Sequence, residues 1–402
     1  MKKVLGLDVG SSSVISCCLS AKPVGLRSYF DAHKRNIEEF TASKAGIRTL
    51  LQLHPDVAIM EPSGVHYSEF WYRALTTSGV EVRWVGHVQI RSYRKSHLLP
   101  DKNDRADALA LACYGLDHLS EPEFFLRFTP EVAQKMRRLY LQLQHLNRLQ
   151  NPIINCARQY LAHEFPEAAK RQSQRQKPND VPALWGWLSG ERPSPFFDRL
   201  WHQSVARDFG LTISDFTRAQ ARRICDLERH QGVIEQEIEQ LMSLAAFAFY
   251  HHVFNEFGFG LRTRAVLLSH FYPFEDFLGP SKQPIVDWQE SRGGKRTKRD
   301  RSLRAFKLRL GMGLIEDSSG KSTAWIPGGS SLCREALWLW VLTRVEPKQD
   351  NRRLQTEVGQ QLGTYIDKLK ANGVPGKVAQ LRTAAKATAM LYKKLLAQIY
   401  RI

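Results

Sequence analysis

Cysteine is scarce in this sequence, and the few cysteines form no pattern that holds a metal or a disulfide framework. There is no CxxC pair, and no histidine stands at ligand spacing from a cysteine. A chain of 402 residues can bury a sizeable core without disulfide or metal staples. We therefore expect reduced, mostly buried cysteines and no structural zinc, with adjacent Cys17 and Cys18 on opposite faces of one strand.

Long apolar runs are also missing. A membrane-spanning helix needs roughly 18 to 20 consecutive apolar residues, and no stretch approaches this length. The apolar stretch Val4 to Val9 is short and already contains Asp8, so we expect no secretory signal at the N-terminus. These absences predict a soluble cytoplasmic protein without a membrane partner.

Acidic residues are too few to balance the basic ones. The chain has 58 Lys and Arg against 40 Asp and Glu, which gives a formal net charge of +18. The positive electrostatic field of such a chain attracts a polyanion and makes the binding of that polyanion depend on salt concentration. Nucleic acid is the first class of partner to consider, and the absence of a spanning run leaves an anionic membrane surface as the weaker reading.

The first 125 residues predict a mixed α/β domain. The runs VLGLDV, VISCCL and LRSYF have the spacing of a strand meander, and two further apolar runs begin at Val57 and Val80. Helical patterns cover Tyr67 to Thr77 and a stretch from about Asp104 to Leu119.

Two later stretches have the heptad spacing of long, packed helices. One runs over residues 136–153 and is interrupted only by Gln150, and the other runs over residues 224–241 and is broken by Gln231. Helices with such seams pack on each other, within one chain or between chains. We therefore expect a helical hairpin or coiled coil over residues 126–245.

The residues between these seams, from about 165 to 208, are rich in Pro, Gln, Arg and Trp. They have the composition of an insertion at the tip of the helical hairpin. The sequence leaves two readings open, an ordinary solvated loop or a tip that contacts nucleic acid.

The last part of the chain contains two features that suit phosphate contact. FGFGLRTRAVLL, from Phe257, is a Gly-x-Gly turn followed by a helix, which places backbone N–H groups where a phosphate can bind. A dense basic segment follows, and its density favours phosphate contact over a merely solvated surface. Its candidate nucleic-acid-binding residues are Arg292, Lys295, Arg296, Lys298, Arg299, Arg301, Arg304 and Lys307.

Four carboxylates stand in an order that suggests metal chemistry. Asp8 and Glu61 each end a buried strand, whereas Asp104 and Asp107 lie at i and i+3 on one helix face. Gathering four acids is costly unless a cation neutralises them. Their oxygens suit Mg²⁺ or Mn²⁺, and two such ions about 3.5 to 4 Å apart can clamp a phosphodiester. Each acid alone has an ordinary role at a turn, strand end or helix start; together they are typical of a ribonuclease H-like nuclease.

The acidic segments GLDVGSSSV, IMEPSGVHY and LLPDKNDRADALALA resemble the three motifs of the DEDD transposases of insertion sequences. This family includes the pilin-gene inverting recombinase and the bridge-RNA-guided recombinases. The resemblance implies a ribonuclease H-like (RuvC-like) catalytic domain over residues 1–125. It also implies four metal ligands, which are Asp8, Glu61, Asp104 and Asp107. The second motif departs from the family, with Pro-Ser after the acid where Ala-Thr is more usual.

Four C-terminal motifs are similar in order and spacing to the family's transposase domain. They are FGFGLRTRAVLL, RAFKLRLGMGLIEDSSGKS, GGSSLCREALW and GKVAQLRTAAKATAMLY. The resemblance implies a mostly α-helical domain over residues 246–402 and places the family's nucleophilic serine at Ser319, directly before Gly320. Ser318 and Ser322 remain alternatives.

By this resemblance, the chain is a DNA transposase or recombinase that cleaves and rejoins strands with bound Mg²⁺ or Mn²⁺. Its implied partners are donor and target DNA, a structured guide (bridge) RNA and further copies in a homodimer or tetramer. It would act in a prokaryotic cytoplasm, at the nucleoid.

Two other readings compete with this one. GLDVGSSS also resembles the first phosphate loop of sugar kinases and actin-like ATPases, but the sequence shows no second phosphate loop and no adenosine motif. A nucleic-acid-binding scaffold or domesticated relative without recombination activity is the non-enzymatic reading. The presence of all four acids and Ser319 argues against it.

Overall fold

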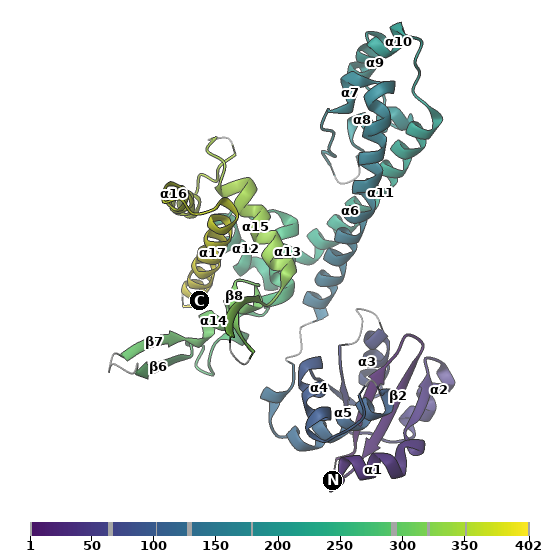
Figure 1. Ribbon diagram of the computed structural model, residues 1–402, viewed down its shortest axis with the longest axis vertical. Helices are drawn as coiled ribbons and strands as arrows, with labels where there is room; N and C mark the ends of the chain where they lie inside the picture. The colour runs from purple at the N-terminus through teal and green to yellow at the C-terminus, as the bar shows by residue number, and fades with distance from the viewer. Residues whose placement is uncertain are drawn as a thin grey trace. The chain divides into compact units, whose positions relative to one another are not determined.

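The structure, a computed structural model, divides into two compact units, residues 1–129 and 130–402 (Figure 1). It describes residues 2–62, 67–101, 103–126, 131–177, 180–290, 296–319, 322–349 and 352–400. Among these residues, no helix has the length and apolar character needed to cross a membrane. All six cysteines are free.

The first unit is built on a five-stranded sheet with the order β3-β2-β1-β4-β5. Strand β1 lies at its centre, antiparallel to β2 and parallel to β4. Strand β3 pairs antiparallel with β2, and β5 pairs parallel with β4. The strands are β1 (Val4–Val9), β2 (Ser13–Leu19), β3 (Glu38–Thr41), β4 (Val57–Met60) and β5 (Glu81–Trp84).

Helices cover both faces of this sheet, as expected for a mixed α/β domain (Figure 1). One buried core joins the sheet to α1, α4 and α5, and a second joins its other face to α2 and α3. Cys17 belongs to the first core and Cys18 packs against the second, which confirms their opposite faces. The helices are α1 (Leu26–His33), α2 (Lys44–Leu51), α3 (Tyr67–Thr77), α4 (His87–Ser96) and α5 (Asp104–His118), with short 3-10 turns η1 (Lys34–Asn36) and η2 (Pro122–Phe124).

The expectation that LRSYF forms a third strand is wrong, because these residues begin α1. Leu26 and Phe30 are its buried residues, and their spacing of four places them on one helix face. The third strand is β3 instead, a short edge strand in which only Phe40 is buried. The sequence of such a strand has almost no alternation of apolar and polar residues by which it could be predicted.

The second unit begins with the expected helical hairpin of α6 (Glu131–Glu164) and α11 (Asp215–Met242). The segment between them is not a solvated loop, and that reading is wrong. It folds into short helices that share a core with α6 and α11, in which Phe165, Trp185 and Leu188 are fully buried. These helices are α7 (Pro166–Ala169), α8 (Ala183–Ser189), α9 (Pro195–His202) and α10 (Val205–Asp208).

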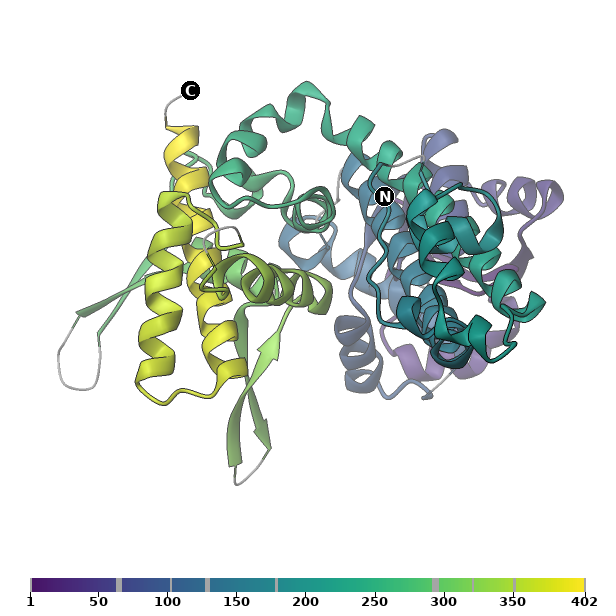
Figure 2. The ribbon, with the colours of Figure 1, turned by 90° about the horizontal axis from the view of Figure 1, so that it is seen from above.

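The C-terminal part is a helical bundle that shares one core with the base of the hairpin, where Met136, Leu143 and Ile238 join it. Helices α16 and α17 lie side by side within it (Figure 2). Its helices are α12 (Ala248–Glu256), α13 (Leu261–Phe271), α14 (Arg301–Arg309), α15 (Ser331–Trp340), α16 (Glu357–Ala371) and α17 (Gly376–Ile399), with the short turns η3 (Ala245–Phe247) and η4 (Phe274–Phe277) and the π-helix η5 (Val341–Val345).

Two antiparallel β-hairpins extend from this bundle, and the sequence patterns did not predict them (Figure 2). The strand sequence RTKRD has no apolar alternation, so it was interpreted only as a basic segment. The hairpins are β6 (Val286–Glu290) with β7 (Arg296–Asp300), and β8 (Gly313–Ser319) with β9 (Ser322–Gly328).

Candidate metal centre

Asp8 and Glu61 lie next to each other at one edge of the sheet. Strands β1 and β4 run parallel, and Leu7 pairs with Met60. Asp8 is the next residue on β1, and Glu61 is the first residue after β4. The carboxyl ends of neighbouring parallel strands therefore bring these two acids together.

Helix α5 lies directly against β1 because position 6 has no side chain. A Cβ on Gly6 would lie 2.1 Å from the carbonyl oxygen of Ala108 and 2.3 Å from the amide nitrogen of Ala112, both on α5. Asp8 is two residues further along β1, on the same face as Gly6. Its side chain is thus on the side of the sheet that α5 covers.

The first turn of α5 supplies the other two acids. Asn103 caps the helix, and its side-chain oxygen accepts a hydrogen bond from the backbone N–H of Ala106 at 3.1 Å. Asp104 and Asp107 follow within that turn, as the sequence predicts. All four acids thus belong to elements that meet at one sheet edge.

The electrostatics of Asp8 show that these acids interact. Burial, and then the negative charges of Asp107, Asp104 and Glu61, raise the pKa of Asp8 from 3.8 to about 7, while Arg94 opposes the shift. A carboxyl group with this environment resists ionisation unless positive charge is brought close to it.

Arg94 of α4 is the cation whose charge lowers the pKa of Asp8, and it is 9% exposed. Its guanidinium donates to Asp107 and lies 3.6 Å from Asp101. Burial nonetheless outweighs Arg94 and raises the pKa of Asp107. Sequence reasoning did not single out Arg94, since nothing in its spacing indicates this contact.

His87, the first residue of α4, was missed by sequence reasoning. Its Nδ1 lies 2.8 Å from Oε2 of Glu61, and its ring is 62% exposed whereas the Glu61 side chain is 17% exposed. Both residues follow parallel strands at the same sheet edge, β5 and β4. That shared edge is the one signal that would have pointed to His87.

Within the described part of the chain, no three His, Cys, Asp or Glu side chains are grouped closely enough to hold a metal ion. Asp107 and Glu61 are instead engaged by Arg94 and His87. The donor set itself fits a hard cation, since it offers carboxylate oxygens only. The raised pKa of Asp8 supplies the electrostatic reason for a cation to bind there.

Residues 5–166 match the family model of the IS110-type DEDD transposases, described as a transposase. Over this stretch the chain is similar to the DEDD transposases. The matched residues include all four acids, and they support DNA transposase or recombinase as the general class of enzyme, with DNA as its substrate. No curated protein matches the chain.

The serine nucleophile expected from the sequence lies beyond the matched residues. Ser319 is the last residue of β8, where it pairs with Ser322, the first residue of β9. Gly320 and the side chains of Ser318, Ser319 and Ser322 lie outside the described residues. The role of Ser319 therefore stays a prediction.

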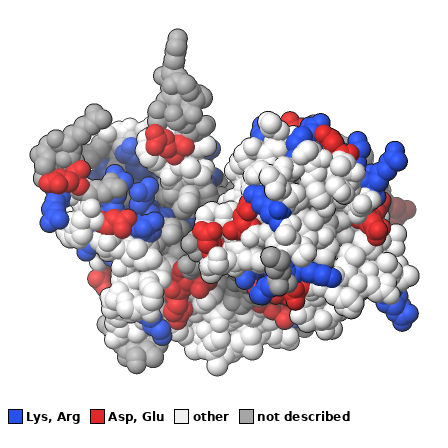
Figure 3. Space-filling model, turned by 90° about the horizontal axis from the view of Figure 1, so that it is seen from below, with Lys and Arg blue, Asp and Glu red and all other residues white. Residues whose placement is uncertain are grey.

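The basic segment supplies strand β7 and helix α14. Figure 3 shows Lys and Arg side chains on both sides of that view, interspersed with Asp and Glu. Arg301 lies 3.4 Å from Asp287, which offsets part of its charge. The exposed candidates are Arg296, Lys298, Arg299, Arg301 and Arg304, whereas Lys307 is half-buried and Arg292 and Lys295 lie outside the described residues.

Proposed function

We propose that this transposase cleaves and rejoins DNA strands at a metal centre formed by four acids, Asp8, Glu61, Asp104 and Asp107. The observation that carries the proposal is the raised pKa of Asp8, which arises from burial and from the other three acids. Clusters of this kind are characteristic of functional sites, because folding alone gives no reason to assemble them. Mg²⁺ or Mn²⁺ is the cation class that suits these ligands.

When bound, a divalent cation would neutralise the acids and polarise the scissile phosphate. Arg94 holds Asp107 from the side of α4 and fixes its orientation. His87 holds Glu61 in the same way, at 2.8 Å, from a position open to solvent. The two residues thus position acids that come from different elements.

We propose that Ser319 supplies the nucleophile from the second unit. Its Oγ forms a bond to the phosphorus of the scissile phosphodiester, the bond from phosphorus to the leaving DNA oxygen breaks, and the serine proton passes to that oxygen. The serine–DNA ester keeps the energy of the broken linkage, so that a DNA hydroxyl can reverse the step and join new strands. A base or metal must assist, because a serine hydroxyl is a weak nucleophile at neutral pH.

The β6–β7 hairpin suits contact with a nucleic-acid strand. Trp288 is 61% exposed and pairs across the hairpin with Lys298. An exposed indole can stack on a base while neighbouring Lys and Arg side chains contact phosphates. We propose that these residues bind DNA or a structured guide RNA, and that a homodimer or tetramer is the active assembly.

A plasmid recombination assay with the DNA that flanks the gene tests this function. We expect Asp8→Ala, Glu61→Ala, Asp104→Ala and Asp107→Ala each to abolish cleavage in Mg²⁺ while nucleic-acid binding persists. Wild-type cleavage by any two of these variants would refute the metal centre. RNA that co-purifies with the protein would be sequenced, and full activity of nuclease-treated protein would exclude a guide RNA.

A further inference from the structure

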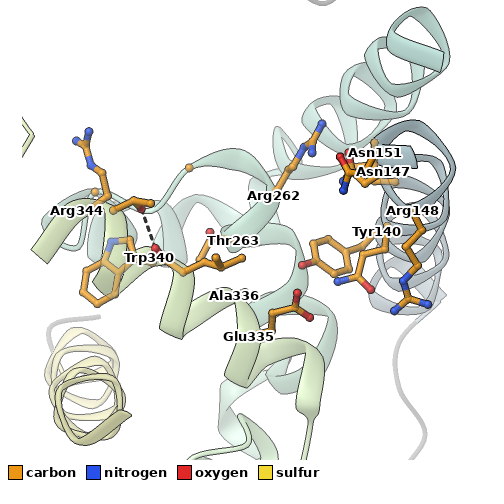
Figure 4. Close-up of a pocket in the computed structure, with 16 residues that line it drawn as sticks. Tyr140, Asn147, Arg148, Asn151, Arg262, Thr263, Glu335, Ala336, Trp340 and Arg344 are labelled. Atoms are coloured by element: carbon orange, nitrogen blue, oxygen red, sulfur yellow. Dashed lines mark hydrogen bonds between the residues drawn. The ribbon is translucent and has the colours of Figure 1, made fainter. Parts of the chain in front are cut away.

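The second unit contains a cavity of about 680 Å³ where α6, α13 and α15 meet, and the candidate metal centre does not involve it (Figure 4). Its size falls within the range of small-molecule and cofactor sites, roughly 300 to 1,000 Å³. One wall is a face of α6 that carries the amides of Gln144, Asn147 and Asn151, spaced by three and four residues. The cavity is therefore polar on the side of the hairpin.

Three arginines from three elements line this cavity, against a single acid, Glu335, among the described lining residues. Arg262 is held in place, because it donates to Glu235 at 2.7 Å and to Gln231 at 2.9 Å. The side chains of Arg148 and Arg344 are exposed, and neither has a hydrogen-bond or ion-pair partner within the described part of the chain. Two guanidinium groups are thus free to bind an anion.

The turn between α12 and α13 also lines the cavity and adds backbone donors to it. Gly258 has φ +56°, and Gly260 precedes α13 without a side-chain cap. The first N–H groups of an uncapped helix have no partner within the helix. A Cβ at Gly260 would meet nothing within 4 Å, so the space in front of α13 is open. Arg262 and these N–H groups place positive charge at one end of the cavity.

We propose that this cavity binds a nucleic-acid strand through its backbone phosphates, with Arg148 and Arg344 as the contacting cations. The cavity, at about 680 Å³, has room for part of a strand, and the amides of α6 can form neutral hydrogen bonds to its sugar or base. Glu335 and Tyr140 both line the cavity, and burial, followed by the charge of Glu335, raises the pKa of that phenol. A phosphate is therefore expected on the arginine side of the cavity and not beside Glu335. The inference deepens the proposed function, on which it rests, by locating a strand-binding site in the second unit.

Binding of fluorescein-labelled single-stranded DNA and RNA of the same sequence, measured by anisotropy in EDTA at several salt concentrations, tests the proposal. We expect Arg148→Gln/Arg344→Gln to weaken binding about 10-fold near physiological salt. The slope of log K against log salt should fall by about 1.4, since each single-strand phosphate contact contributes about 0.7. Glu335→Gln should tighten binding. Lys368→Gln/Lys377→Gln removes the same charge from exposed positions that do not line the cavity, and its slope should change less.

A loss confined to the RNA or to the DNA arm would support the proposal and identify the strand. Equal slopes for the cavity variant and its lysine control would overturn it, while leaving the metal centre untouched. Absence of binding of either strand by the wild-type protein would also overturn the cavity proposal, whereas the proposed function is tested separately by the recombination assay in Mg²⁺. Circular dichroism of each variant confirms that the fold persists.

Discussion

Gln231 donates a hydrogen bond from its side-chain amide to the side-chain oxygen of Gln150 at 2.8 Å. These are the two residues that interrupt the apolar seams of α6 and α11, and both are almost fully buried. Gln150 in turn donates to Glu228 at 2.7 Å. Arg175, from the segment between the hairpin helices, bonds both Glu228 and Glu235. The interruptions are therefore partners in one buried polar network that fixes how the two helices align.

Replacing one member of this network should destabilise the second unit. Gln150→Leu removes the acceptor of the buried Gln231 amide N–H and one of the donors to Glu228. Because a buried donor is left unsatisfied, we expect the free energy of unfolding to fall by about 1 to 3 kcal/mol. Urea unfolding followed by circular dichroism measures the change. Leu149→Ala, at a neighbouring position that is 47% exposed, is the control and should be nearly neutral. Equal stabilities for the two variants would show that the network contributes nothing.

Asp8→Asn should stabilise the metal-free protein above neutral pH. The folded-state pKa of Asp8, about 7, exceeds its unfolded value of 3.8. The folded protein therefore binds the Asp8 proton more tightly, and the stability this gives at low pH is lost as the pH rises through 7. We expect the variant to melt several degrees higher than wild type at pH 8 and at the same temperature at pH 3.5.

The same melting measurement, repeated with added Mg²⁺, tests whether the cation binds at Asp8. Mg²⁺ should raise the melting temperature of the wild-type protein at pH 8, because a ligand that binds only the folded state stabilises it. The rise should be much smaller for Asp8→Asn. An equal rise in both proteins would place the cation elsewhere.

His270 should make the second unit sensitive to acid. Burial lowers its pKa from 6.5 to about 4, and its neutral ring lies 2.7 Å from the carbonyl oxygen of Val266 and 3.0 Å from Oγ of Ser330. The unfolded chain binds this proton first as the pH falls, so stability is lost between pH 6.5 and 4, by about 3 kcal/mol in total. Urea titrations at pH 7 and pH 4.5 should show a smaller loss for His270→Gln. The same loss as in wild type would contradict the assignment; His252→Gln, at an exposed position, is the matched control.

Ser319 should become covalently joined to DNA during strand exchange. Trapping the reaction on a labelled substrate, digesting the protein and identifying the adducted peptide by mass spectrometry tests this expectation. An adduct on Ser318 or Ser322 would shift the assignment along the hairpin. Wild-type strand exchange by Ser319→Ala would end the covalent-serine mechanism for this protein.

The candidate site was largely predictable because its acids lie on regular elements. Strand-end positions and the i, i+3 spacing are properties of local sequence, and they located Asp8, Glu61 and the first turn of α5. Arg94 and His87 were not predictable, because their contacts depend on how α4 follows β5 in space.

The hairpins and the segment at the tip of α6 and α11 escaped prediction for another reason. Strand β7 is charged and exposed, so its pairing with the adjacent β6 leaves no apolar alternation in the sequence. The short apolar run around Trp185 lies between polar, proline-containing stretches, and its core is completed by residues of α6 and α11 that a local pattern does not reveal.

The close contact of Gly6 with α5 fixes the position of Asp8 relative to this helix, but it does not involve Glu61. Asp8 and the first turn of α5 are coupled through backbone atoms that meet without an intervening side chain, so strand and helix move as one piece. Glu61 stands outside this piece, after β4, and its partner His87 is exposed. A bound cation would therefore find Asp8 and the first turn of α5 in a fixed arrangement, whereas the orientation of Glu61 would depend on its contact with the exposed His87.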